Sequence, residues 1–204
     1  MLFGLRVMGP GRTVFGFQPS PGGSYLLSSN NKTGTRTGVG SGSWRSIISA
    51  LSKSKALQPY AEFTFLANVT GNNIVGVWSG AATPTSVESG YGGGAAGNST
   101  GYHQDGTLYY TDAPLDSYSS YAVNDVIGVG IQNDGSGTIR FWKNGVLAGS
   151  PAVNVAAIAG SASSPVFVGI SGTSTGVPGG SYTMNLGDQP FFNLPAGYTP
   201  WEQA

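Results

Sequence analysis

The segment from Asp125 to Ser150, DVIGVGIQNDGSGTIRFWKNGVLAGS, constrains the fold of this chain more than any other stretch. Its first part, Val126–Ile131, is apolar with interspersed glycines, which is typical of a strand buried on at least one face. The cluster 133–137 is rich in turn residues. Asn144-Gly145 then lies between β-prone residues, a strong signal for a hairpin with a type I′ turn, in which both central residues have positive φ. The segment therefore predicts antiparallel strands joined by tight turns.

The strand between the two turns shows a clean two-residue period. In Thr138–Trp142, polar and apolar residues alternate. Successive side chains of a strand point to opposite faces, so we expect Ile139 and Phe141 on one face and Arg140 and Trp142 on the other.

Composition narrows the classes of protein that the chain can represent. Its 204 residues suffice for one domain with a proper core. Nine basic residues balance nine acidic ones, and only 9% of residues are charged, so nucleic acid and anionic membranes are poor partners. The chain contains no cysteine, which excludes disulfides and thiolate chemistry. No stretch has the length of a membrane span, and the N-terminus does not resemble a signal peptide.

Residues 1–22 differ from the rest of the chain. They contain two short apolar stretches broken by Gly9-Pro10-Gly11 and followed by Pro19, Pro21 and two glycines. One interpretation is a terminal strand packed under the domain's own sheet, and the other is an arm that attaches the domain to a partner. We expect the arm, followed by a domain over residues 23–204. Its candidate attachment residues are Leu2, Phe3, Leu5, Val14, Phe15 and Phe17.

Short strand-like segments with frequent turn signals follow from Tyr25 onward, as in an all-β sandwich or jelly roll. Three polar stretches, 79–100, 111–120 and 171–181, are expected to form outward-facing loops. Such long loops in compact domains are commonly functional. Residues 47–55 and 153–158 are the two short pieces with helical character.

Several motifs occur in a fixed order along residues 25–200. They are Tyr60-Ala61-Glu62-Phe63, Ile74-Val75-Gly76-Val77, Gly101–Gly106, Asn124–Val129, Ile139–Gly145, Asn185-Leu186-Gly187 and Pro190–Tyr198. This order resembles the SPRY domain family, with Asn124 in place of the usual Gly and Leu186 in place of Phe. The resemblance implies an all-β, antiparallel, concanavalin A-like β-sandwich. It also implies a protein-interaction module without catalytic residues, whose ligands bind loops at one end of the sandwich.

Residue chemistry gives little support to an enzyme. His103 is the one histidine, and Asp105 or Asp112 are candidates to orient it as a base. The resemblance instead makes His103 a structural sheet residue. The chain lacks a Gly-x-Ser-x-Gly elbow and the paired carboxylates of a glycosidase strand. The cluster 133–137 superficially resembles a calcium loop but lacks its carboxylate spacing, so we expect a turn, no metal and no cofactor.

Uncharged polar and aromatic loop residues are the remaining candidates for binding, because tyrosine beside Ser, Gly and Asn offers rigid amphipathic contact surface. The alternative is that these tyrosines cover sheet edges. The candidate ligand-binding residues are Tyr91, Asn98, Asp112, Asp116, Tyr118 and Tyr121.

The most similar SPRY domains, short and rich in Gly and Ser, occur in bacteriophage structural and adhesin proteins. By this analogy we expect a non-enzymatic virion protein, assembled in the host cytoplasm, that is a fibre or tail adhesin or a capsid decoration protein. Its expected partners are other virion proteins or sister subunits, and a host-surface glycan or protein. An intracellular peptide-binding SPRY adaptor and a carbohydrate-active enzyme are the alternatives.

Overall fold

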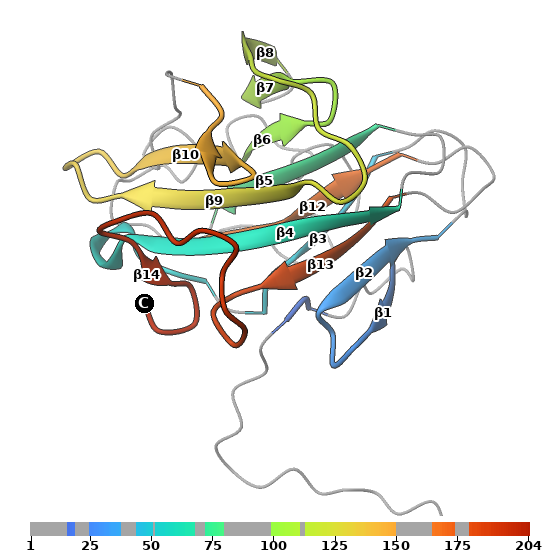
Figure 1. Cartoon of the computed structure of the whole chain (residues 1–204), viewed down its shortest axis with the longest axis horizontal. Helices are drawn as coiled ribbons and strands as arrows, with labels where there is room; N and C mark the ends of the chain where they lie inside the picture. The colour runs from blue at the N-terminus through green and yellow to red at the C-terminus, as the bar shows by residue number, and fades with distance from the viewer. Residues whose placement is uncertain are drawn as a thin grey trace, which may run out of the picture.

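The computed structural model is an antiparallel β-sandwich of two sheets (Figure 1). It describes residues 16–18, 25–37, 44–50, 52–67, 72–79, 99–110, 113–149, 165–173 and 180–204. The first sheet has the order β1 (Tyr25–Ser28), β2 (Thr33–Arg36), β13 (Ser181–Asn185), β4 (Pro59–Ala67), β9 (Val126–Gln132), β10 (Thr138–Lys143) and β11 (Val146–Leu147), with β14 (Thr199–Pro200) parallel to β4. The second sheet has the order β3 (Arg45–Ile48), β12 (Val166–Gly172), β5 (Asn73–Ser79), β6 (Ser99–His103), β7 (Thr107–Tyr110) and β8 (Ala113–Ser117). A 3₁₀ turn, η1, covers Lys55–Leu57.

The hairpin of β10 and β11 confirms the turn chemistry expected from the sequence. Lys143 pairs with Val146, which leaves a two-residue turn. Both turn residues have positive φ, 48° for Asn144 and 79° for Gly145. This is the type I′ geometry, whose twist matches that of the flanking strands.

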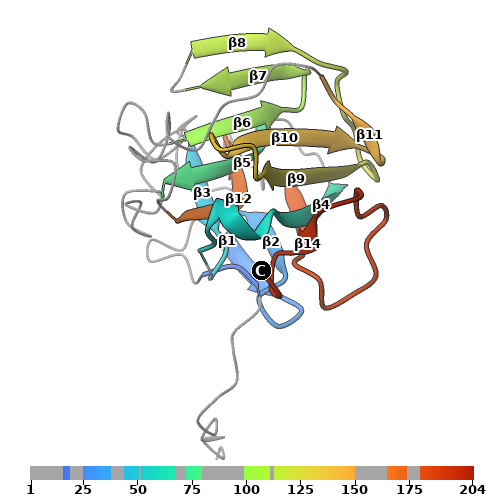
Figure 2. The same cartoon turned by 90° about the vertical axis from the view of Figure 1, so that its left-hand side faces the viewer.

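A single large core fills the space between the sheets, and Figure 2 shows the layers after a 90° turn. Ile139 and Phe141 of β10 are buried in this core, as the alternation predicts. Facing strands contribute aliphatic and aromatic side chains. Among them are Val75, Val77, Val129, Ile131, Val168, Ile170, Phe63 and Phe65.

The outer face of the first sheet is covered by the C-terminal part of the chain. Trp142 points to this face, opposite Phe141, yet it is buried. Its ring packs edge-on against Tyr60 at 5.5 Å and against Tyr198 at 5.2 Å between ring centroids. Gly128 and Gly130 make room for these rings, because a Cβ at Gly128 would lie 2.1 Å from the Tyr60 hydroxyl.

Glu62 fastens this C-terminal segment to the sheet. The side chain is buried, and its carboxylate accepts hydrogen bonds from the backbone N–H groups of Phe192 (2.7 Å) and Asn193 (3.0 Å). It also accepts one from the Tyr60 hydroxyl (3.1 Å). A buried carboxylate needs such donors, since leaving it unpaired would be costly. Glu62 is therefore a structural anchor.

Two expectations about secondary structure were wrong. Part of 47–55 was expected to be helical, but Ile47 and Ile48 end strand β3 and only the short turn η1 follows. Within 111–120, expected to be a loop, Ala113–Ser117 forms the edge strand β8. Nearly all of β8 is exposed on both faces, so its sequence lacks the alternation that marks a half-buried strand. The stretch 153–158 lies outside the described residues.

Phe17 is a correction to the expected attachment arm. Its side chain is fully buried and packs 6.4 Å from the Phe63 ring, inside the domain's own core. A bridge between Phe17 and Ser49 holds this part of the chain against the edge of β3. At this position the terminal-strand interpretation is the right one, because an apolar ring is stabilised by burial in the sandwich. The other candidate arm residues, Leu2, Phe3, Leu5, Val14 and Phe15, lie outside the described residues.

Candidate functional site

The sandwich has two ends, and the expected outward loops leave from both of them. In the pairing of β5 with β12, Asn73 lies opposite Gly172 and Ser79 lies opposite Val166. The connection that follows β5 therefore starts at one end, called here the Ser79 end, and the connection that follows β12 starts at the other, the Asn73 end. The expected loops 79–100 and 171–181 do not emerge together.

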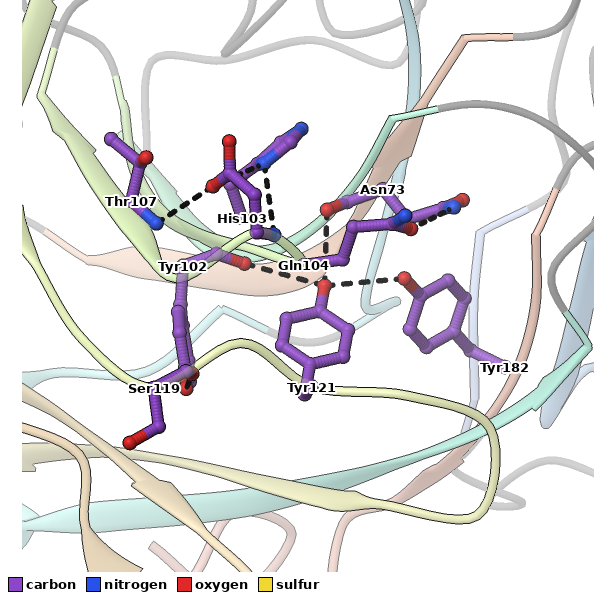
Figure 3. Close-up of polar contacts among 9 residues, drawn as sticks. Asn73, Tyr102, His103, Gln104, Thr107, Ser119, Tyr121 and Tyr182 are labelled. Carbon is purple, nitrogen blue, oxygen red and sulfur yellow. Dashed lines mark hydrogen bonds and ion pairs between the residues drawn. The ribbon is translucent and has the colours of Figure 1, made fainter.

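A cluster of buried polar side chains lies at the Asn73 end (Figure 3). The Tyr121 hydroxyl is 3.1 Å from the Asn73 carbonyl oxygen and 3.3 Å from the Tyr182 hydroxyl, so it can donate to the first and accept from the second. The Asn73 amide donates to the Gln104 side-chain oxygen at 2.6 Å. Burial raises the pKa of both Tyr121 and Tyr182 above the usual value, so both hydroxyls keep their protons.

Backbone bonds tie three chain connections together at this cluster. The Gln104 N–H, from the turn between β6 and β7, donates to the Asn73 carbonyl at 2.9 Å. The Tyr121 N–H, from the segment between β8 and β9, donates to the Gln104 carbonyl at 2.9 Å. The Tyr102 hydroxyl donates to the Ser119 carbonyl of the same segment. The described connections at the Asn73 end are thus held in one arrangement by bonds that cross between strands.

A buried arginine makes further stabilising contacts at the Asn73 end of the sandwich. Arg36, the last residue of β2, donates to the carbonyl oxygens of Thr37 at 2.7 Å and Gly172 at 3.4 Å. Its guanidinium carbon lies 6.0 Å from the centre of the Tyr25 ring, within range of a cation–π interaction. Because β2 and β12 belong to different sheets, Arg36 links the two layers.

The structure places the sequence-predicted binding residues in different surroundings. Tyr121 is buried in the core and its hydroxyl is used within the chain, so its expected place on an exposed loop is corrected. Tyr118 is half buried and packs edge-on against Tyr102 at 5.4 Å. Burial, with Asp116 nearby, raises the pKa of Tyr118 to about 12. Asp116 itself lies on the edge strand β8. Tyr91, Asn98 and Asp112 lie outside the described residues.

His103 is a strand residue with a carboxylate partner. It is buried at the end of β6, and its Nδ1 lies 2.7 Å from the Asp105 carboxylate. Burial alone would raise the pKa of Asp105, but hydrogen bonds from the Thr107 N–H and from His103 outweigh it and lower that pKa. The imidazole ring packs edge-on against Trp44 and Tyr109. These contacts orient the ring within the sheet, and among the described residues no hydroxyl is bonded to Nε2.

The carboxylate of Asp134 is bonded within the turn at 133–137. One oxygen of Asp134 accepts hydrogen bonds from the backbone N–H groups of Ser136, Gly137 and Thr138, at 3.0, 2.8 and 3.2 Å. This is the local bonding of an Asx-type turn.

Among the described residues no group of three or more His, Asp or Glu side chains is placed to hold a metal ion. Nor does any helix in the described ranges have the length and apolar composition to cross a membrane.

Sequence reasoning missed most of the cluster at the Asn73 end. Asn73, Gln104 and Tyr182 carry no motif that marks them as partners. Gln104 lies within the Gly101–Gly106 motif, and Asn73 directly precedes the Ile74–Val77 motif. A part-buried hydrogen bond between side chains 31 positions apart has no local signal in the sequence.

Comparison with known proteins identifies the fold. No protein-family model matches the chain, and no curated protein matches it in sequence. Among solved structures, a human SPRY domain is similar, with a TM-score of 0.59, 22% identity, and coverage of 86% of this chain and 99% of that one. The SPRY domain of human HERC1 gives a TM-score of 0.58, 16% identity, and coverage of 83% and 96%. The carbohydrate recognition domain of Emp46p, potassium-bound, gives 0.50, 13%, and coverage of 83% and 85%.

These similarities define the fold class. The chain has the concanavalin A-like sandwich fold of SPRY domains, as the order of its sequence motifs led us to expect.

Proposed function

We propose that this chain is a non-catalytic binding module of a bacteriophage virion and that it binds its ligand at the Asn73 end of the sandwich. The observation that supports a binding site at this end is the hydrogen-bonded cluster beneath it, formed by Asn73, Gln104, Tyr121 and Tyr182. A surface whose supporting side chains are already ordered loses less conformational entropy on binding. Preorganisation of this kind favours recognition of a surface by shape.

The exposed residues over the cluster are suited to contacts with an uncharged ligand. Val123 is 41% exposed in the segment between β8 and β9, next to the exposed polar residues Ser120 and Asn124. Asn72 and Asp105 are exposed beside them. The mixture of one apolar side chain with two amides, one hydroxyl and the Asp105 carboxylate fits a glycan or a polar protein surface.

The virion role is supported by composition. The chain has 34 glycines, no cysteine and few charges, and it begins with an apolar segment that precedes the described domain. In this proposal residues 1–15 attach the domain to other virion proteins or to sister subunits. The domain then acts as a fibre or tail adhesin, or as a decoration protein of the head.

Mass spectrometry of purified particles tests the virion role. We expect peptides of this chain in particles, and a chain without residues 1–15 should fold yet be missing from them. A protein that never copurifies with particles but binds peptides in the cytoplasm would overturn the virion role in favour of an intracellular adaptor. Normal incorporation of the truncated chain would overturn the role of the N-terminal segment.

Binding to host cells and to a glycan array tests the ligand site. A Val123→Lys variant should lower binding about tenfold or more, because it places a charge on the proposed surface. Leu57→Lys is the matched control, since Leu57 is 50% exposed at the Ser79 end. Equal losses from both variants would overturn the assignment of the site. Hydrolysis of host polysaccharide that disappears on replacing one carboxylate would overturn the non-catalytic role.

A further inference from the structure

The edge strand β1 is open to the addition of another strand. Natural sheets protect their edges with charges, prolines, bulges, very short strands or a covering segment. Strand β8 carries Pro114 and Asp116, β11 has two residues, and β3 is bridged by Phe17 at Ser49. Strand β1, with the sequence YLLS, is four residues long but has no charge, proline or bulge, and no strand of the described residues pairs with its outer edge. Its Leu26 is 68% exposed.

The direction of the chain at residues 16–18 is fixed by hydrogen bonds to the segment that contains β3. The Ala50 N–H donates to the Gly16 carbonyl and the Gln18 N–H donates to the Ile48 carbonyl, so residues 16–18 run antiparallel to β3. They run from the Ser79 end toward the Asn73 end, because β3 runs the opposite way. Gly16 is therefore at the Ser79 end, and β1 of the same copy extends back from there. The direction from Phe17 to Gly16 points away from that β1.

The sequence before Gly16 contains an apolar stretch that is suited to pairing with an open apolar strand edge. Leu2–Val7 contains four apolar residues and one charge, on Arg6. Residues 8–15 lie between this stretch and Gly16, and at about 3.3 Å per residue they span up to about 26 Å. This distance is enough to reach a neighbouring copy.

We propose that Leu2–Val7 of one copy adds as a strand to β1 of a second copy. Backbone hydrogen bonds along the edge would supply affinity, and contact with Leu26 would bury apolar surface on both copies. This inference rests on the proposed attachment role of the N-terminal segment and names what that segment binds. Reciprocal exchange closes a dimer, whereas exchange in one direction builds an open chain of subunits.

Cysteine cross-linking tests the contact directly, because the natural chain contains no cysteine. Chains with Phe3→Cys are mixed with chains carrying Leu26→Cys and treated with an added oxidant. Neither chain has both thiols, so a disulfide between the two kinds of chain can only be intermolecular. Leu115→Cys is the matched control, since Leu115 is 49% exposed on the edge strand β8. We expect cross-linking to Leu26→Cys in at least about tenfold excess over the control.

Sedimentation of the untreated full chain gives a second measurement. We expect association that depends on concentration, that is lost on removal of residues 1–15, and that weakens about tenfold in a Leu26→Lys variant whose circular dichroism is unchanged. Equal cross-linking at Leu115→Cys, or association of the truncated chain, would overturn the proposal. So would an intramolecular disulfide in a chain carrying both Phe3→Cys and Leu26→Cys without any dimer. A monomeric full chain that still enters virions would overturn self-association alone and leave the proposed virion role intact.

Discussion

Tyr121 shows how one hydroxyl can connect several chain segments. The ring lies in the core, edge-on to Phe65 at 5.7 Å, and the hydroxyl reaches the Asn73 carbonyl and Tyr182. Its neighbours are buried, so water cannot replace the bonds that it makes. The residue looks like a surface tyrosine in the sequence only because it lies in a polar stretch.

We therefore expect Tyr121→Phe to destabilise the protein by about 1–2 kcal/mol, since the Asn73 carbonyl loses a donor and Tyr182 loses a partner. Urea unfolding measures the change. Tyr198→Phe is the control. The Tyr198 hydroxyl has no hydrogen bond to any of the residues that the structure describes, so the expected change is below about 0.5 kcal/mol. Equal effects of the two substitutions would contradict the role given to the Tyr121 hydroxyl.

Asn144 combines a backbone requirement with side-chain bonds. Its φ is positive, its Oδ1 accepts from the Val126 N–H at 2.8 Å, and its Nδ2 donates to Asp125 at 2.6 Å. Asn144→Ala should destabilise by about 2–3 kcal/mol, because alanine strains the left-handed conformation and lacks both bonds. Asn144→Gly removes the bonds without the strain and should cost about 1 kcal/mol. Thermal unfolding of both variants separates the two effects, and equal losses would contradict the backbone requirement.

At the scale of elements, Asp125 joins the start of β9 to the β10–β11 hairpin. Burial alone would raise the pKa of Asp125, but hydrogen bonds from the Ala122 N–H, Asn144 and the Lys143 ammonium outweigh it and lower that pKa below its usual range. The hairpin is therefore held partly by an ionised group. A carboxylate whose pKa is lowered in the folded state stabilises the fold above its unfolded pKa, and this stability disappears as the pH falls through the folded value.

The pH dependence of Asp125→Asn tests this element. The variant should be less stable than the natural chain by about 1–2 kcal/mol between pH 5 and 7, a window above the ordinary aspartate pKa. The difference should begin to shrink as the pH falls below about 4, where the unfolded chain takes up a proton at Asp125, and should disappear as the pH falls through the lower pKa of Asp125 in the folded protein. Urea unfolding at a series of pH values measures it. A difference that stays constant down to pH 2 would show that the charge of Asp125 contributes nothing.

At the scale of the whole molecule, the domain begins before the boundary expected at residue 23. Phe17 lies in the core beside Gly34 of β2, packs against Phe63 of β4, and forms a bridge with Ser49 next to β3. The segment at 16–18 also bonds to both layers, through the Asn31 carbonyl of the first sheet's β1–β2 turn and through Ile48 of β3. The segment at 16–18 therefore connects the two sheets at one side of the sandwich.

Phe17→Ala should consequently destabilise the domain by about 3–5 kcal/mol, the usual effect of removing a buried phenylalanine ring. Removal of residues 1–15 leaves Phe17 in place and should change the free energy of unfolding by less than about 1 kcal/mol. Chemical denaturation compares the two variants. A truncated chain as unstable as Phe17→Ala would show that residues before Gly16 also contribute to the core.

The sequence by itself determined the local features of this protein. Alternation in Thr138–Trp142 gave the correct faces of β10, and Asn144-Gly145 gave the correct turn, because both depend on residues adjacent in the chain. The order of the motifs gave the correct sandwich. Edge strand β8 escaped detection, since a strand exposed on both faces has no alternation to read.

Only the tertiary structure decided which residues meet. Glu62 binds the backbone of Phe192, 130 positions away, and Tyr121 meets Tyr182 across 61 positions. The separation of the Asn73 and Ser79 ends follows from strand pairing and not from loop composition. No local pattern encodes such contacts. They arise because burying apolar faces between two sheets brings distant segments together, and the polar groups trapped among them must then find partners within the fold.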